Sequence, residues 1–113
     1  MSKRFAHVGQ HLFIGIHGRE LTPATRRLLN TIQPGGIVLF ARNVGPAGVL
    51  REFTRALCEK LPYRPLIAID QENGRVNRLR EIVGELPTIA ELKTGDVVDY
   101  VCRELEWVKS QLL

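Results

Sequence analysis

The chain has 113 residues, of which 44% are hydrophobic and 25% are charged, and these values are ordinary for one globular domain. The net charge is +4, but the basic residues are scattered among acidic ones without interleaved aromatic residues, so we expect a mildly basic surface and no nucleic-acid partner. The longest apolar run is too short to cross a membrane and no secretion signal is recognisable, so we expect no membrane partner and a cytoplasmic location.

The first quarter of the chain predicts a strand followed by a helix. The apolar run Leu12–Ile16 has the length and residue types of a buried strand. Thr22 followed by Pro23 is typical of a helix start, because threonine caps the first turn and proline suits the first helical position. We expect this helix to end before Pro34.

Two more strands and another helix are predicted between residues 37 and 69. Ile37–Phe40 is the second strand, a helix with apolar residues at helical spacing ends at Leu61, and Leu66–Ile69 is the third strand. The last two strands are continuously apolar, which predicts that each is covered on both faces. This β-α-β-α-β order predicts parallel strands with right-handed crossovers, the beginning of a doubly wound sheet or of a barrel.

The remainder predicts a polar loop and then helices. Residues 71–84 are expected to be a loop without an element of its own, and long loops of this kind are usually functional. Pro87 and Thr88 open a short helix, and Asp96 is the expected cap of a last helix whose apolar stripe begins at Val97. Both cysteines fall in predicted helices, where we expect buried free thiols.

Asp70 is the first candidate for a functional residue. It follows the third predicted strand directly, and ligands bind at the carboxyl ends of strands in barrels and open α/β sheets. Arg75 and Arg78 follow in the same polar loop. A carboxylate and a guanidinium offer acceptors and directed donors, which suit a polyhydroxylated ligand. From position alone, a structural salt bridge is an equally good interpretation.

Other polar side chains follow the remaining strands. His17 is a candidate to line the mouth of the site, although a solvent-exposed loop histidine is the favoured alternative. Arg42 and Asn43 either line the site or fix their loop by hydrogen bonds. Arg75 is either a site arginine or a partner of Glu72. Two histidines near the N-terminus lack a third ligand and no nucleotide-binding glycine motif occurs, so we expect neither a metal nor a cofactor.

The residues that begin at Asp70 form a recognisable motif. Asp70–Leu79 reads Asp-Gln-Glu-Asn-Gly-Arg-Val-Asn-Arg-Leu. This string closely resembles the motif Asp-Gln-Glu-Gly-Gly-Arg-Val-x-Arg-Leu of family 3 glycoside hydrolases, in particular of their bacterial β-N-acetylhexosaminidase branch, with Asn73 in place of the first glycine. Three further stretches resemble its opening strand, its second strand with the loop that follows, and a later Leu-Pro: Gly9–Phe13, Pro34–Asn43 and Leu86–Thr88.

The resemblance implies a fold and a binding site. Residues 1–113 are expected to form one partial domain, the beginning of a TIM-type (β/α)8 barrel, in which residues 97–113 match the family only loosely. Asp70 is implied to accept hydrogen bonds from hydroxyls of the non-reducing sugar, and Arg78 to bind the same sugar. Asn73 is expected to preserve the turn, because asparagine tolerates a positive φ better than other non-glycine residues.

The resemblance also implies a function. The whole enzyme is expected to release terminal β-linked N-acetylglucosamine with retention, through a covalent intermediate on an aspartate and with a loop histidine as acid/base. Both residues belong to later strands of the family, so we expect this chain to hold part of a carbohydrate site and to lack activity alone. Two alternatives stay open: an interaction module that forms homo-oligomers through exposed strand edges, and a non-catalytic sugar-binding protein.

Overall fold

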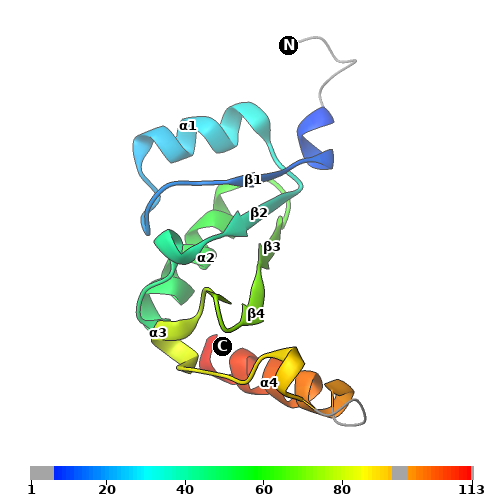
Figure 1. The fold of residues 1–113 in the computed structure, drawn as a ribbon. Coiled ribbons are helices and arrows are strands. Elements are labelled where there is room, and N and C mark those ends of the chain that lie inside the picture. Colours follow the sequence, from blue (N-terminus) through cyan, green and yellow to red (C-terminus); the bar gives the residue numbers. More distant parts are fainter. Residues whose placement is uncertain (1–6, 93–96, 113) are drawn as a thin grey trace.

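The computed structural model describes residues 7–92 and 97–112, in which three parallel strands form a sheet (Figure 1). These strands are β1 (Phe13–Gly15), β2 (Gly36–Leu39) and β3 (Leu66–Ile69). β2 pairs with both of the others, so the order of strands in the sheet follows their order in the chain. The strands expected from the apolar runs, and their parallel pairing, are confirmed.

Two helices connect the strands of this sheet. α1 (Pro23–Ile32) leads from β1 to β2, and α2 (Ala47–Lys60) leads from β2 to β3. The side chain of Thr22 accepts a hydrogen bond of 3.2 Å from the backbone N–H of Thr25, and Pro23 is the first helical residue, so the predicted helix start is confirmed. Because crossovers between sequential parallel strands are right-handed, both helices cover the same face of the sheet.

The hydrophobic core lies between that face and the two helices. Ile37 and Leu39 of β2 are at most 3% exposed, and they belong to one cluster with Leu29 of α1 and Leu57 of α2. Burial of such aliphatic side chains contributes about 1.5–3 kcal/mol each. The other buried members of the cluster come from the loops, from α2 and from the segment after β3: Ile16, Val44, Leu50, Phe53, Leu61, Leu79 and Val83.

The opposite face of the sheet is left open by the described residues. Phe13 of β1 is 51% exposed and Leu66 of β3 is 65% exposed, and both align in register with Gly36 of β2. The expectation of cover on both faces is therefore wrong for β3, whereas in β2 only Val38 is partly exposed. The reason is that both crossover helices lie on one face.

The segment after β3 is more ordered than the sequence predicts. β4 (Gln71–Asn73) pairs antiparallel with β5 (Val76–Asn77), and α3 (Arg80–Val83) follows. The expectation of a loop without an element of its own over residues 71–84 is therefore wrong. The hairpin is held by hydrogen bonds between amide side chains, which leave no hydrophobic periodicity in the sequence.

Two helical elements complete the described chain. The short helix expected after Pro87 is η4 (Ile89–Glu91), where the Thr88 backbone N–H donates to the Glu91 carboxylate at 2.7 Å. The expected last helix is α4 (Val97–Leu112), which lies against α2 (Figure 1). Its expected cap, Asp96, lies outside the described residues.

Single turns of 3-10 helix precede β1 and follow β2, namely η2 (Val8–His11) and η3 (Ala41–Asn43). The stretch expected as an opening strand, Gly9–Phe13, is therefore largely this first turn. Both cysteines are free. Cys58 is only half-buried and Cys102 is exposed, so the expected burial is wrong for Cys102 and only partial for Cys58. No helix among the described residues is both long and apolar enough to span a membrane.

Candidate functional site

Polar residues follow each strand of the sheet at its carboxyl end. His17 lies two residues after β1, Arg42 lies three residues after β2, and Asp70 follows β3 directly. All three are exposed. Because parallel strands end at a common edge, these residues lie on the side of the sheet where ligands bind in barrels and open α/β sheets. This edge therefore offers an imidazole, a guanidinium and a carboxylate.

The β4–β5 hairpin brings Asp70 and Arg78 to its base. Gln71 pairs with Asn77 across the hairpin, and Asp70 precedes the first of these residues while Arg78 follows the second. The two predicted sugar-binding residues therefore lie on adjacent chain segments. Arg75 is exposed in the turn at the far end of the hairpin, so the structure does not bring it to this base.

The Phe40 ring lies against two guanidinium groups. The Cζ atoms of Arg42 and Arg78 are 4.8 Å and 5.7 Å from the ring centroid, within the range of a cation–π interaction. Arg42 Nε also donates to the Ile16 carbonyl at 3.0 Å, whereas Nε of Arg78 is buried and has no hydrogen-bond partner among the described residues. A Cβ at Gly15 would lie 3.2 Å from Arg42 Nη2, so glycine leaves room for this arrangement.

Asn43 fixes the loop after β1. Its side chain is fully buried, Oδ1 accepts from the Phe40 backbone N–H at 2.9 Å, and Nδ2 donates to the carbonyls of Ile16 at 3.1 Å and Gly18 at 2.7 Å. These carbonyls flank His17, so Asn43 holds the backbone on both sides of the histidine. The structure therefore shows the loop-fixing hydrogen bonds considered for Asn43, whose polar atoms are buried and bonded within the protein.

Ion pairing does not account for the other candidate residues. Arg75 and Glu72 form no ion pair with each other, so the partnership considered for them is not seen in the part of the chain that the structure describes. Asp70 likewise has no ion-pair partner among residues 7–92 and 97–112. The structural salt bridge considered for Asp70 is thus not observed. Within the same residues, no three metal-ligating side chains come together.

Sequence reasoning missed the side chains that hold this edge in place. Phe40 was not predicted to contact the arginines, although its position at the end of an apolar strand is a usable signal. The amides of Gln71, Asn73 and Asn77 were also missed. Their separations of two and four residues are a weak signal, because residues at even separations share one face of an extended segment.

Comparison with known proteins identifies similar chains. No family model matches the sequence. The chain is 39% identical over 79 residues to a β-hexosaminidase of Thioalkalivibrio sulfidiphilus, a match that covers 70% of this chain and 23% of that relative. The chain therefore spans about a quarter of the length of this relative.

Solved structures share both the fold and part of the sequence. The family 3 β-N-acetylglucosaminidase from Paenibacillus sp. str. FPU-7 matches with a TM-score of 0.67 and 30% identity, over 78% of this chain and 17% of that one. NagZ from Neisseria gonorrhoeae in complex with N-trifluoroacetyl-D-glucosamine matches with a TM-score of 0.62 and 32% identity, over 67% of this chain and 23% of that one. The chain therefore belongs to glycoside hydrolase family 3, in the branch of the β-N-acetylhexosaminidases, and spans only a part of their length.

Proposed function

We propose that the chain forms the first β/α units of a TIM-type barrel and supplies part of a site for a terminal, β-linked, N-acetylglucosamine-type sugar. The parallel sheet with both crossover helices on one face supports the barrel, since in that fold the helices surround the strands. In this proposal the open face that carries Phe13 and Leu66 is turned toward the inside of the barrel. The sugar analogue bound by the similar Neisseria gonorrhoeae protein supports the class of ligand.

The observation that carries this proposal is that Asp70 and Arg78 both lie at the base of the hairpin, next to the paired residues Gln71 and Asn77. Asp70 is exposed and has no ion-pair partner among the described residues, while Arg78 has a buried Nε without a hydrogen-bond partner there. A carboxylate accepts hydrogen bonds from sugar hydroxyls, and a guanidinium donates to sugar oxygens. Arg42 and His17 are proposed to line the same edge, and Arg75 is proposed only for the rim of the site.

The whole protein is proposed to hydrolyse the glycosidic bond with retention, through a pair of catalytic groups. Asp70 and Arg78 bind the sugar in this proposal, and neither is the nucleophile or the acid/base. The chain alone is therefore expected to be inactive toward a nitrophenyl β-N-acetylglucosaminide. Release of nitrophenol clearly faster than in a buffer blank, and lost in Asp70→Ala, would contradict this division between binding and chemistry.

Titration of N-acetylglucosamine into the chain, followed by amide chemical shifts, tests the binding site. We expect saturable shifts at the carboxyl end of β3 and at the base of the hairpin in the wild type. Asp70→Ala should weaken binding by about tenfold or more, since it removes charged hydrogen bonds worth about 1.5–3 kcal/mol. Glu72→Ala is the matched control, because it removes an exposed carboxylate of the same loop and should leave binding unchanged. Equal binding by Asp70→Ala, or none by the wild type, would overturn the proposal.

Self-association is a second candidate function, favoured by the open edge and open face of the sheet. β3 ends the sheet, Leu66 is 65% exposed and Phe13 is 51% exposed. An open groove of about 800 Å³ also lies between β3 and α2, with Ile67 among its lining residues. Unpaired strand edges of this kind pair with other chains. Light scattering after size-exclusion chromatography should show a dimer that Leu66→Lys dissociates and that Leu28→Lys, on α1, leaves intact. A monomer at all concentrations would rule this candidate out.

A further inference from the structure

Asn73 stands where the related motif has glycine, and its side chain makes hydrogen bonds that a glycine cannot make. Its φ is +65°, a conformation that glycine adopts without strain, and the residue as a whole is only 7% exposed. We propose that Asn73 and Glu104 form a positioning pair that ties helix α4 to the hairpin and thereby fixes Asp70 and Arg78 at its base. This inference rests on the proposed function in one respect, namely that these two residues bind the sugar.

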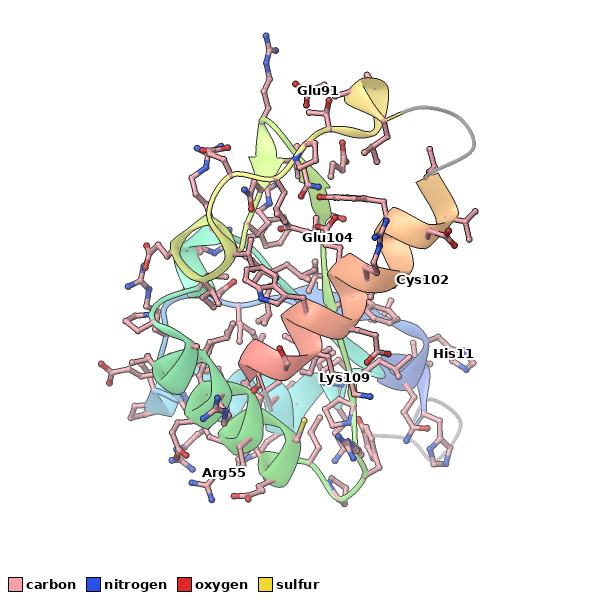
Figure 2. The ribbon with its side chains drawn as sticks, turned by 90° about the horizontal axis from the view of Figure 1, so that it is seen from below. His11, Arg55, Glu91, Cys102, Glu104 and Lys109 are labelled. Carbon is pink, nitrogen blue, oxygen red and sulfur yellow. The ribbon has the colours of Figure 1, made fainter. Side chains whose placement is uncertain are left out.

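The contact between the hairpin and α4 is direct. Asn73 Nδ2 donates to Glu104 Oε2 at 3.2 Å and to the Pro87 carbonyl at 3.0 Å, while Asn73 Oδ1 accepts from Gln71 Nε2 at 2.9 Å. Figure 2 shows the Glu104 side chain between α4 and the hairpin. Both N–H groups of the Asn73 amide are therefore used, one for a segment 14 residues away and one for a helix 31 residues away.

The hydrogen bonds continue from Asn73 to the base of the hairpin. Gln71 Nε2 also donates to Asn77 Oδ1 at 2.8 Å, and Gln71 Oε1 accepts from the Leu79 backbone N–H at 3.2 Å. Asn77 Nδ2 donates to the Gly84 carbonyl at 2.8 Å. Such connected, largely buried networks are sensitive to the loss of one member, because an unpaired polar group costs more in a low dielectric.

Gln71 and Leu79 are the sequence neighbours of Asp70 and Arg78, so the network ends beside the proposed binding residues. Leu79 is 2% exposed and anchors its side of the hairpin in the core. The Arg78 Nε has no hydrogen-bond partner among the described residues, so the direction of its guanidinium depends on its backbone and on the Phe40 ring. A shift of the Gln71 amide therefore moves the backbone that aims Arg78.

Hydrogen exchange of the Leu79 amide tests the pair without any sugar. Asn73→Gly keeps the backbone conformation and removes only the side chain, and Glu104→Ala removes the partner on α4. Both should speed exchange of the Leu79 amide by about tenfold while the amides of β2 keep their protection, since the change is a local opening. Glu104→Gln should resemble the wild type, because its amide oxygen still accepts from Asn73. Glu106→Ala, an exposed carboxylate of α4, is the matched control.

Two results would overturn the inference. One is unchanged Leu79 exchange in both Asn73→Gly and Glu104→Ala. The other is an equal rise at Leu79 and throughout β2, which would indicate a general loss of stability. If Asn73→Gly does not fold, the comparison of Glu104→Ala with Glu104→Gln decides, because Glu104 lies outside the core cluster.

The same variants titrated with N-acetylglucosamine separate this inference from the proposed function. Wild-type binding that weakens by about threefold to tenfold in Asn73→Gly and Glu104→Ala, and recovers in Glu104→Gln, supports a positioning role. Wild-type binding that all variants retain overturns that role while the proposed function stands. If the wild type binds no sugar, the proposed function fails, and Leu79 exchange still decides whether α4 is tied to the hairpin.

Discussion

Replacing Asn43 by alanine tests how the carboxyl edge of the sheet is held together. The amide of Asn43 is fully buried and makes three hydrogen bonds, accepting from the Phe40 backbone N–H and donating to the carbonyls of Ile16 and Gly18. Each hydrogen bond contributes about 0.5–1.5 kcal/mol net, and removal leaves buried partners unpaired. We therefore expect Asn43→Ala to lower the free energy of unfolding by about 2–4 kcal/mol.

Urea unfolding followed by circular dichroism measures this loss. Asn30→Ala is the matched control, because Asn30 is exposed on α1 and the same chemical change there should alter stability by less than about 0.5 kcal/mol. Asn43→Asp keeps the acceptor and loses both donors, so it should also destabilise the protein. A loss below about 1 kcal/mol in Asn43→Ala would refute the reasoning, since it would mean that water replaces the three bonds.

Two further changes test the N-terminal turn and the alkaline limit of stability. A Cβ on Gly9 would overlap the Ile32 carbonyl, so Gly9→Ala should lower the free energy of unfolding by about 1–3 kcal/mol or more. A Cβ on Gly48 would point into open space, so Gly48→Ala should stabilise α2 by about 0.5–1 kcal/mol. Equal urea midpoints for the two variants would contradict this. Burial raises the pKa of the Tyr63 phenol, whose hydroxyl donates to the Pro34 carbonyl at 3.0 Å. A folded pKa above the unfolded value stabilises the protein below pH ~10, and this contribution disappears as the pH rises through the folded pKa. The free energy of unfolding should therefore fall above pH ~10, and less steeply in Tyr63→Phe; identical slopes would contradict the assignment.

The regular elements around the core were predictable because their signals are local. The apolar runs marked β2 and β3, and the pair Thr22 and Pro23 marked the start of α1, since capping and the fixed φ of proline act within one turn. Parallel pairing followed from the alternation of strands and helices. These local signals do not tell which face of the sheet other elements cover, so the exposure of Phe13 and Leu66 was not predicted.

The hairpin after β3 was not predictable for a different reason. Its stability comes from Gln71, Asn73 and Asn77, whose partners lie up to 31 residues away in the chain. Asparagine and glutamine occur in exposed loops, in turns and in buried hydrogen-bond networks, so the residue type alone does not predict which of these a side chain occupies. The same uncertainty affected Asn43, for which the sequence allowed two interpretations.

At the carboxyl edge of the sheet, polar side chains that already have hydrogen-bond partners within the protein support the structure, and those without such partners are available to a ligand. Asn43 and Asn73 each bond the chain through both ends of the amide, so a ligand would have to break existing bonds to use them. Asp70 is exposed without an ion-pair partner among the described residues, and the Arg78 Nε is buried there without an acceptor. A ligand oxygen that reaches the Arg78 guanidinium therefore displaces no hydrogen-bond partner supplied by the described residues. Arg42 is less available to a ligand than Arg78, because its Nε already donates a hydrogen bond to the Ile16 carbonyl. Replacement of Arg42 should consequently weaken sugar binding less than replacement of Arg78. The reverse order in the N-acetylglucosamine titration would refute the argument that a side chain already bonded within the protein contributes less to ligand binding.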